Sequence, residues 1–308
     1  MLADMWYLSM KDRSDVRTLG VCALKWVLFL GFWHLFPMLG VVACMGAVFI
    51  LFLASFYVSC MVHNAMHVDV FNTPAVETMW RFFLTATFGF PVEAYRPTHN
   101  ANHHVFTQHE KDHLHTSQMT YDRRWLNLLL FFPTVYPGIM KLENEYVRKE
   151  FKKNSWSFYR FAGQAMCAHG TTLAIILMDW RVGLLFWFLP NVLGVDAIIT
   201  MNMLQHDGCE LITLGQHRGE KMEINNSRNF VGPIINWLTC NNGYHTIHHM
   251  HSNVHWSRYP EMHAKLVEPR MDPSLNERCL VRYLWRTYFW PGELAAYRQH
   301  ENPQHKAD

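Results

Sequence analysis

Apolar residues are concentrated in four long runs that polar segments separate. The run over 39–62 has no charged residue and exceeds the about 20 helical residues that cross a hydrocarbon core. A weaker run covers 19–36, and a second pair of runs covers 161–178 and 182–204. Because only two residues (37–38) or three residues (179–181) separate the members of each pair, the pattern predicts four transmembrane helices in two hairpins.

Two further apolar stretches, 82–92 and 125–140, are shorter and together contain three prolines. Proline removes a backbone N–H and disfavours the interior of a long helix. If 82–92 crossed the bilayer, the histidine clusters on its two sides would lie at opposite membrane faces and could not share ions. We therefore expect interfacial or re-entrant helices here.

Composition and charge agree with a membrane protein. Half of the residues are apolar and only 17% are charged, against about 25% in a typical soluble domain. All but two of the 27 Lys and Arg residues, Lys25 and Arg181, lie before residue 20, in 61–160 or in 206–308, which assigns these three segments to the cytoplasmic side. The sequence thus predicts an all-α integral membrane protein with one domain over 1–308, whose four helices carry a cytosolic helical cap, 63–160 and 206–308.

Histidines recur at helical spacing in three clusters of the polar segments. Residues three and four apart share one face of a helix, so each cluster can direct its imidazoles at a common point. In the middle cluster, His104 is expected about 100° around the helix from the face that the other two share. An isolated pair with the i, i+4 spacing, Asn202 and His206, ends the last apolar run. The three clusters are His63/His67, His99/His103/His104 and His245/His248/His249.

This pattern predicts a metal site with up to nine imidazole ligands, which is enough for two ions. Structural zinc closes with four ligands and catalytic zinc uses three, so nine histidines exceed both. Imidazole suits several transition metals, and the ligand set alone does not name the metal. A site beside the bilayer suggests oxygen activation next to a lipid chain, because unactivated C–H bonds are beyond acid or base side chains.

The clusters resemble the histidine boxes of the integral-membrane fatty acid desaturase and hydroxylase superfamily. That pattern is H-x(3,4)-H followed by two H-x(2,3)-H-H boxes, and it reads here HNAMH from His63, HNANHH from His99 and HTIHH from His245. Nearly the whole chain is covered, since the family also pairs membrane hairpins with cytosolic boxes. Asn202-x-x-x-His206 is similar to an element of the stearoyl-CoA desaturase type.

The resemblance implies a non-haem di-iron centre, two Fe ions that use O2 as co-substrate and desaturate a long fatty acyl chain. It implies a lipid or acyl-thioester substrate. The chain lacks a His-Pro-Gly-Gly haem motif, so the electrons are expected from a separate ferredoxin or cytochrome type of donor. No nucleic-acid partner is expected. The implied iron ligands are His63, His67, His99, His103, His104, His206, His245, His248 and His249, with Asn202 acting through a water.

Four acidic residues are candidates to hold the ligands in place, because metal-bound histidine commonly donates its other N–H to a carboxylate. Asp69, Asp112 and Asp207 each lie within a few residues of a box or of His206. Asp196 lies within the last apolar run and is expected near the ligands or along a substrate tunnel.

Other functions remain open at this point. Hydroxylation is the closest, because the second box has the three-residue gap of alkane hydroxylases, and the first box also resembles that of carotenoid ketolases. His109-Glu110-Lys111-Asp112-His113 matches the H-E-x-x-H pattern of zinc metalloproteases, although its polar flanks differ from those of an intramembrane protease. A metal transporter would need ligands at mid-membrane, where only His34, His169 and Asp196 are available.

Overall fold

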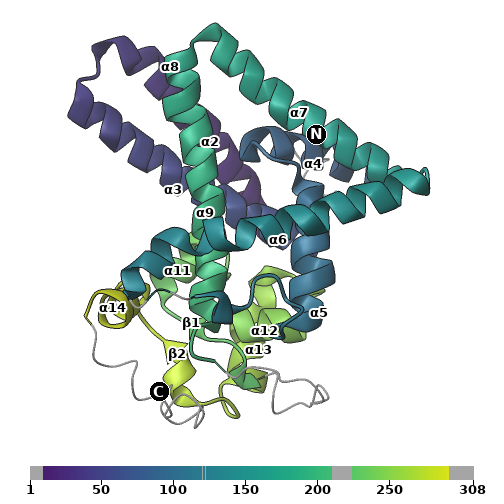
Figure 1. Ribbon diagram of the computed structural model, residues 1–308, viewed down its shortest axis with the longest axis vertical. Helices are drawn as coiled ribbons and strands as arrows, with labels where there is room; N and C mark the ends of the chain where they lie inside the picture. The colour runs from purple at the N-terminus through teal and green to yellow at the C-terminus, as the bar shows by residue number, and fades with distance from the viewer. Residues whose placement is uncertain (1–9, 120, 122, 210–223, 291–308) are drawn as a thin grey trace. The chain divides into compact units, whose positions relative to one another are not determined.

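The computed structural model describes residues 10–119, 121, 123–209 and 224–290, and these are mostly helical (Figure 1). Parts of the predicted cytosolic cap, 210–223 and 291–308, lie outside the described residues. The chain divides into two compact units. Unit 1 comprises residues 1–97 and 142–198, and unit 2 comprises residues 98–141 and 199–308.

Unit 1 contains the long apolar helices. Helix α2 packs on α3, and α7 packs on η6, the π-helical turn at the start of the last run. Helix α9 begins in unit 1 and ends in unit 2. The elements of unit 1 are η1 (Arg13–Asp15), α2 (Val16–Leu35), η2 (Phe36–Met38), α3 (Val41–Ala65), α4 (Pro74–Phe88), η3 (Val92–Ala94), the start of η4 (Arg96–His103), the end of α6 (Arg124–Lys152), α7 (Trp156–Met178), α8 (Trp180–Val182), η6 (Gly183–Phe188) and the start of α9 (Leu189–His206).

The prediction of four apolar helices is confirmed. The helices long and apolar enough to cross a membrane cover Arg13–Met38, Val41–Ala65, Trp156–Met178 and Trp180–His206. Each lies within a few residues of its predicted run. The stretch 82–92 contributes only the end of α4 and the turn after it, which agrees with its exclusion as a span.

A buried lysine connects three parts of unit 1. Lys25 of α2 is 2% exposed, and its ammonium donates to the carbonyl of Thr87 at 2.6 Å and to the side-chain oxygen of Asn191. Ser55 of α3 donates to the same oxygen at 3.3 Å. Buried polar groups are tolerated when they are hydrogen-bonded, so this network explains how the first, second and fourth apolar helices accommodate Lys25, Ser55 and Asn191.

Unit 2 consists of short helices and turns joined by one pair of very short strands. Its elements are the end of η4 (Arg96–His103), α5 (His104–Phe106), η5 (Thr116–Gln118), the start of α6 (Arg124–Lys152), β1 (Asn229–Phe230), α11 (Pro233–Leu238), α12 (His245–Met250), η7 (Trp256–Arg258), α13 (Tyr259–Met262), η8 (His263–Val267), η9 (Pro273–Leu275), β2 (Asn276–Glu277), α14 (Leu280–Leu284) and η10 (Trp285–Phe289).

Two features differ from the sequence-based expectation. Strands β1 and β2 pair in parallel, with Asn229 opposite Asn276, so the fold is not entirely helical. The stretch 125–140 is the first half of the 29-residue helix α6, which continues through Pro133 and Pro137. Next to the first proline, the hydroxyl of Thr134 donates to the carbonyl of Leu130 at 2.7 Å, a bond of the kind that often bends a helix.

The approach to the third histidine box depends on a glycine without space for a side chain. A Cβ on Gly243 would lie 2.2 Å from the carbonyl oxygen of Phe230 and 2.6 Å from the side-chain oxygen of Asn236. We expect Gly243→Ala to lower the free energy of unfolding by about 1–3 kcal/mol, because backbone atoms must move. Thermal unfolding in detergent would measure this. Gly170→Ala is the control, since its Cβ meets nothing within 4 Å, and equal midpoints for the two variants would contradict the prediction.

Candidate metal centre

Three segments of unit 2 carry seven of the nine predicted histidines. Helix α12 presents the third box at its i, i+3 and i+4 positions, and His245 and His248 are both 1% exposed. The C-terminal end of α9 presents His206, which is fully buried. The second box lies in η4 and the first residue of α5.

The second box forms a π-helical turn, which changes the expected position of His104. In a π-helix the backbone bonds run from i to i+5, so residues five apart approach each other. The Nε2 atoms of His104 and His99 are accordingly 3.1 Å apart, and their ring centroids are 4.6 Å apart. The π-helical turn thus brings the ring nitrogens of His104 and His99 together, a contact that an α-helical second box does not predict.

Four histidines of unit 2 converge on one point. Each of His103, His206, His245 and His249 offers one ring nitrogen, and these nitrogens all lie within 4.8 Å of one another. The Nε2 atom of His245 is 3.0 Å from that of His206 and 3.0 Å from that of His249. This group combines one ligand from the second box, two from the third and one from α9.

Hydrogen bonds at the outer ring nitrogens determine the tautomers of His103 and His206. The tautomer decides which nitrogen directs a lone pair toward the centre. His103 Nδ1 donates to the carboxylate of Asp112 at 2.8 Å, and His206 Nδ1 donates to the backbone carbonyl of Asn226 at 2.8 Å. In the neutral tautomers that these bonds require, both Nε2 atoms carry lone pairs. His103 Nε2 is buried and has no hydrogen-bond partner among the described residues. Converging lone pairs need a cation between them, so these residues fit a bound metal.

The electrostatics of unit 2 favour the neutral form of His249 and the charged form of the supporting carboxylate, Asp112. Burial, followed by the neighbouring imidazoles, holds the pKa of His249 well below its ordinary value. Burial alone would raise the pKa of Asp112, but His103 and the backbone N–H groups of Leu114 and Gln108 bring that pKa below its usual range. Metal ligation requires deprotonated imidazole, so both shifts favour binding of a cation.

The other three histidines of unit 2 form a second group. The Nε2 atom of His104 lies 3.1 Å from that of His99 and 3.0 Å from that of His248. On its outer side, the Nδ1 atom of His248 lies 3.1 Å from the hydroxyl of Tyr259, which is 2% exposed. In this second group, the outer nitrogen of His248 is therefore held by the hydroxyl of Tyr259. In the four-histidine group, the outer nitrogen of His103 is held by the carboxylate of Asp112.

The remaining predicted pair, His63 and His67, belongs to unit 1. His63 lies in the last turn of α3, and His67 lies in the turn just beyond the end of that helix at Ala65. Their ring centroids are 5.4 Å apart, so the i, i+4 spacing does bring the two rings together. The Nδ1 atom of His63 lies 3.3 Å from the side-chain oxygen of Asn64.

Asn202, one turn before His206 on α9, is the tenth predicted residue. It is 7% exposed, and neither the oxygen nor the nitrogen of its amide has a hydrogen-bond partner among the described residues. A buried amide without a partner is costly, so this side chain is suited to bind a water or another polar ligand.

The four acidic candidates have different surroundings. Asp112 is fully buried and bonds His103, as described above. The Asp207 carboxylate accepts a bond from the hydroxyl of Tyr288 at 2.8 Å. Asp69, in unit 1, pairs with Arg81 at 2.7 Å and with Lys11 at 2.9 Å. Asp196, in the apolar part of α9, has one buried carboxylate oxygen without a hydrogen-bond partner among the described residues.

Two supports of the histidines were not anticipated from the sequence. The carbonyl of Asn226 is a backbone group, and any residue could supply it, so no sequence signal marks it. Tyr259 lies eleven residues from His248, in the first turn of α13, and one tyrosine among 12 carries no distinguishing pattern. Both are found only from the folded arrangement of unit 2.

The competing metal hypotheses find no support in the geometry. His109 to His113 form successive turns, whereas the H-E-x-x-H arrangement needs one helix to align its two histidines. Asp112 of that segment supports His103 instead. Among the residues that the structure describes, no group of ligand-type side chains close enough to share an ion includes His34, His169 or Asp196, which a transporter would use.

Four apolar helices and buried clusters of imidazoles define a multi-pass membrane protein with a candidate metal centre. The chain belongs to the fatty acid desaturase family, whose match covers residues 39–279 and therefore includes all nine predicted histidine ligands. The superfamily that the histidine boxes indicated is thus confirmed, and this family is an iron-dependent family of oxidoreductases. No curated protein and no solved structure matches the chain significantly.

Proposed function

We propose that the protein desaturates a long fatty acyl chain with O2. Two irons would be held by nine histidines, which are the eight histidines of the three boxes and His206 of α9. The observation that carries the proposal is the convergence of four imidazoles in unit 2, with the tautomers of two of them set by Asp112 and Asn226. Family membership supports an oxidation of fatty acyl chains or a related substrate. Bound iron would supply the oxygen activation that no side chain in this site can provide.

The residues of the chain hold and insulate this site. Asp112 and the Asn226 carbonyl orient their histidines, and the buried surroundings keep bulk water away from the ligand nitrogens. Asn202 is proposed to hold a water next to one metal, which its unpartnered buried amide supports. His63, His67, His99, His104 and His248 are proposed to complete the nine ligands.

The overall reaction needs two electrons besides O2, and we propose a separate ferredoxin or cytochrome type of protein as their source. Desaturation removes two hydrogens from adjacent methylenes and reduces O2 to two waters. Hydroxylation inserts one oxygen atom and releases one water. The three-residue gap in the second box, which alkane hydroxylases share, makes hydroxylation the alternative outcome. We further propose that the site faces the cytoplasm, because the segments around it carry nearly all the Lys and Arg.

Metal analysis of the detergent-purified protein, followed by mass spectrometry of products from a mixed acyl pool with O2 and a reductant, tests this function. We expect two irons per chain and a product about 2 mass units lighter than its substrate. A gain of about 16 mass units would instead identify a hydroxylase. One zinc per chain without oxygen uptake would refute the proposed oxidation.

A further inference from the structure

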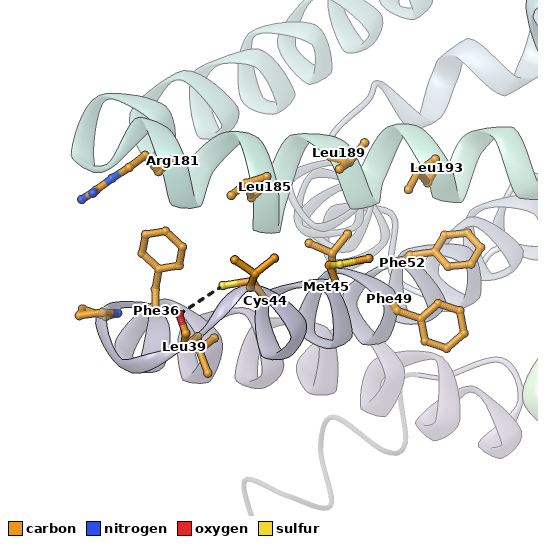
Figure 2. A pocket seen from close by; sticks show the side chains of 13 residues that line it. Phe36, Leu39, Cys44, Met45, Phe49, Phe52, Arg181, Leu185, Leu189 and Leu193 are labelled. Carbon is orange, nitrogen blue, oxygen red and sulfur yellow. Dashed lines mark hydrogen bonds between the residues drawn. The ribbon is translucent and has the colours of Figure 1, made fainter.

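A groove of about 760 Å³ lies in unit 1 between α3 and the segment formed by η6 and α9 (Figure 2). This volume is typical of sites that bind small molecules. One end lies at the turn after α2, at Phe36. Apart from Arg181, the side chains that line the groove are apolar or a cysteine, and its walls include Met45, Phe49, Phe52, Leu185, Leu189 and Leu193.

The position of the groove along its helices corresponds to one leaflet of a bilayer. Both walls belong to helices that are long and apolar enough to span a membrane. Trp180, next to the groove's end, is 64% exposed, and exposed Trp at a helix end is typical of the headgroup level. On the α3 side, the wall from Val41 to Phe52 extends about 17 Å at the α-helical rise. Half of a hydrocarbon core is about 15 Å, so the groove has the length for one acyl chain.

The end at headgroup level carries a cation. Figure 2 shows Arg181 at one end of the groove, opposite Phe36, and its guanidinium carbon is 5.5 Å from the centroid of that ring. Its side chain is 59% exposed, and its Nε atom lies 3.5 Å from Asp179. The same Asp179 oxygen also accepts the backbone N–H of Arg181 at 3.0 Å. Arginine presents five donors, so most of this guanidinium can bind a phosphate.

We propose that this groove binds one glycerophospholipid, with its phosphate on Arg181 and one acyl chain along Leu185, Leu189 and Leu193. The arrangement matches such a lipid in both parts: a cationic mouth at headgroup depth and an apolar channel as deep as a leaflet. The groove lies wholly in unit 1 and shares no residue with the histidine clusters. The lipid is therefore a bound component of the membrane region, and the proposal does not depend on the reaction proposed above.

Native mass spectrometry of the delipidated full-length protein in detergent tests the proposal, with phosphatidylglycerol carrying palmitoyl and oleoyl chains as the probe. We expect one tightly bound lipid per chain. Leu185→Trp fills the groove and should weaken binding at least about 10-fold, because the lost apolar contact involves several methylenes. Leu177→Trp is the matched control on α7. It replaces a leucine that is 77% exposed and is absent from the groove, so it should bind as the wild type does.

Arg181→Gln tests the headgroup contact separately, and because this side chain is exposed the variant should fold normally. Loss of a charge-assisted phosphate bond should weaken phosphatidylglycerol binding about 10-fold. Wild-type affinity in Leu185→Trp would overturn the groove as the binding site. Unchanged affinity in Arg181→Gln, or equally tight binding of palmitate, would overturn the assignment of a phospholipid phosphate.

Discussion

His206→Gln is expected to abolish turnover and to weaken metal binding at the four-histidine group of unit 2 by at least about 100-fold. His206 supplies one of the four converging nitrogens and comes from a helix that carries no other predicted histidine ligand. Changes to groups that only support a ligand already cost 10–100-fold in metal affinity, so loss of the ligand itself should exceed about that range. The measurement is the iron content per chain after anaerobic loading and desalting, alongside product formation.

His263→Gln provides the control for this variant. His263 is also a buried histidine of unit 2, at 3% exposure, but it belongs to neither group of converging nitrogens. If loss of a buried imidazole were harmful in itself, the two variants would lose iron equally. Wild-type iron content and turnover in His206→Gln would remove His206 from the ligand set.

Hydropathy alone was sufficient to locate the apolar helices, because the membrane imposes a length and a composition on each span. The run predicted over 39–62 is observed as Val41–Ala65, and the run over 161–178 as part of Trp156–Met178. The boundaries differ because helix ends depend on local caps. Ser155, for example, accepts a bond from the backbone N–H of Phe158 and starts α7 before its apolar run begins.

The candidate ligands could be found from spacing, but their exact geometry could not. Spacing assumes an α-helix, and the π-helical turn of the second box moves His104 toward His99. Asp112 and Asp207 both lie close in sequence to predicted ligands, so the sequence alone made them equal candidates to accept the outer N–H of a ligand histidine. The turns that follow α5 return Asp112 to His103, whereas the carboxylate of Asp207 meets the hydroxyl of Tyr288. Such long-range folding carries no local sequence signal.

Asp112→Asn is expected to weaken metal binding at the four-histidine group by about 10–100-fold. One carboxylate oxygen of Asp112 accepts from His103 and Gln108, and the other accepts from the backbone N–H of Leu114. Asparagine can replace only one of these acceptors. With its NH2 toward His103, it favours the tautomer that carries the proton on Nε2, the nitrogen that must bind the metal. With its NH2 toward Leu114, it leaves that backbone N–H unpaired and removes the negative charge.

The pH dependence of metal binding distinguishes the lost hydrogen bond in Asp112→Asn from a loss caused by protonation of Asp112. A carboxyl group whose pKa is lowered by folding contributes stability above the pKa of the unfolded chain and loses it as pH falls through the folded pKa. Asp112 therefore stays ionised from about pH 6 to 8, and the deficit of Asp112→Asn should be constant over that range. Chelator competition for Fe(II), performed anaerobically at several pH values, measures this deficit in metal affinity.

Asp272→Asn is the matched control, because that half-buried aspartate caps η9 by accepting from the backbone N–H of Ser274 and belongs to neither group of converging histidines. Equal metal affinities for the two variants would show that the bond from His103 to Asp112 does not support the site.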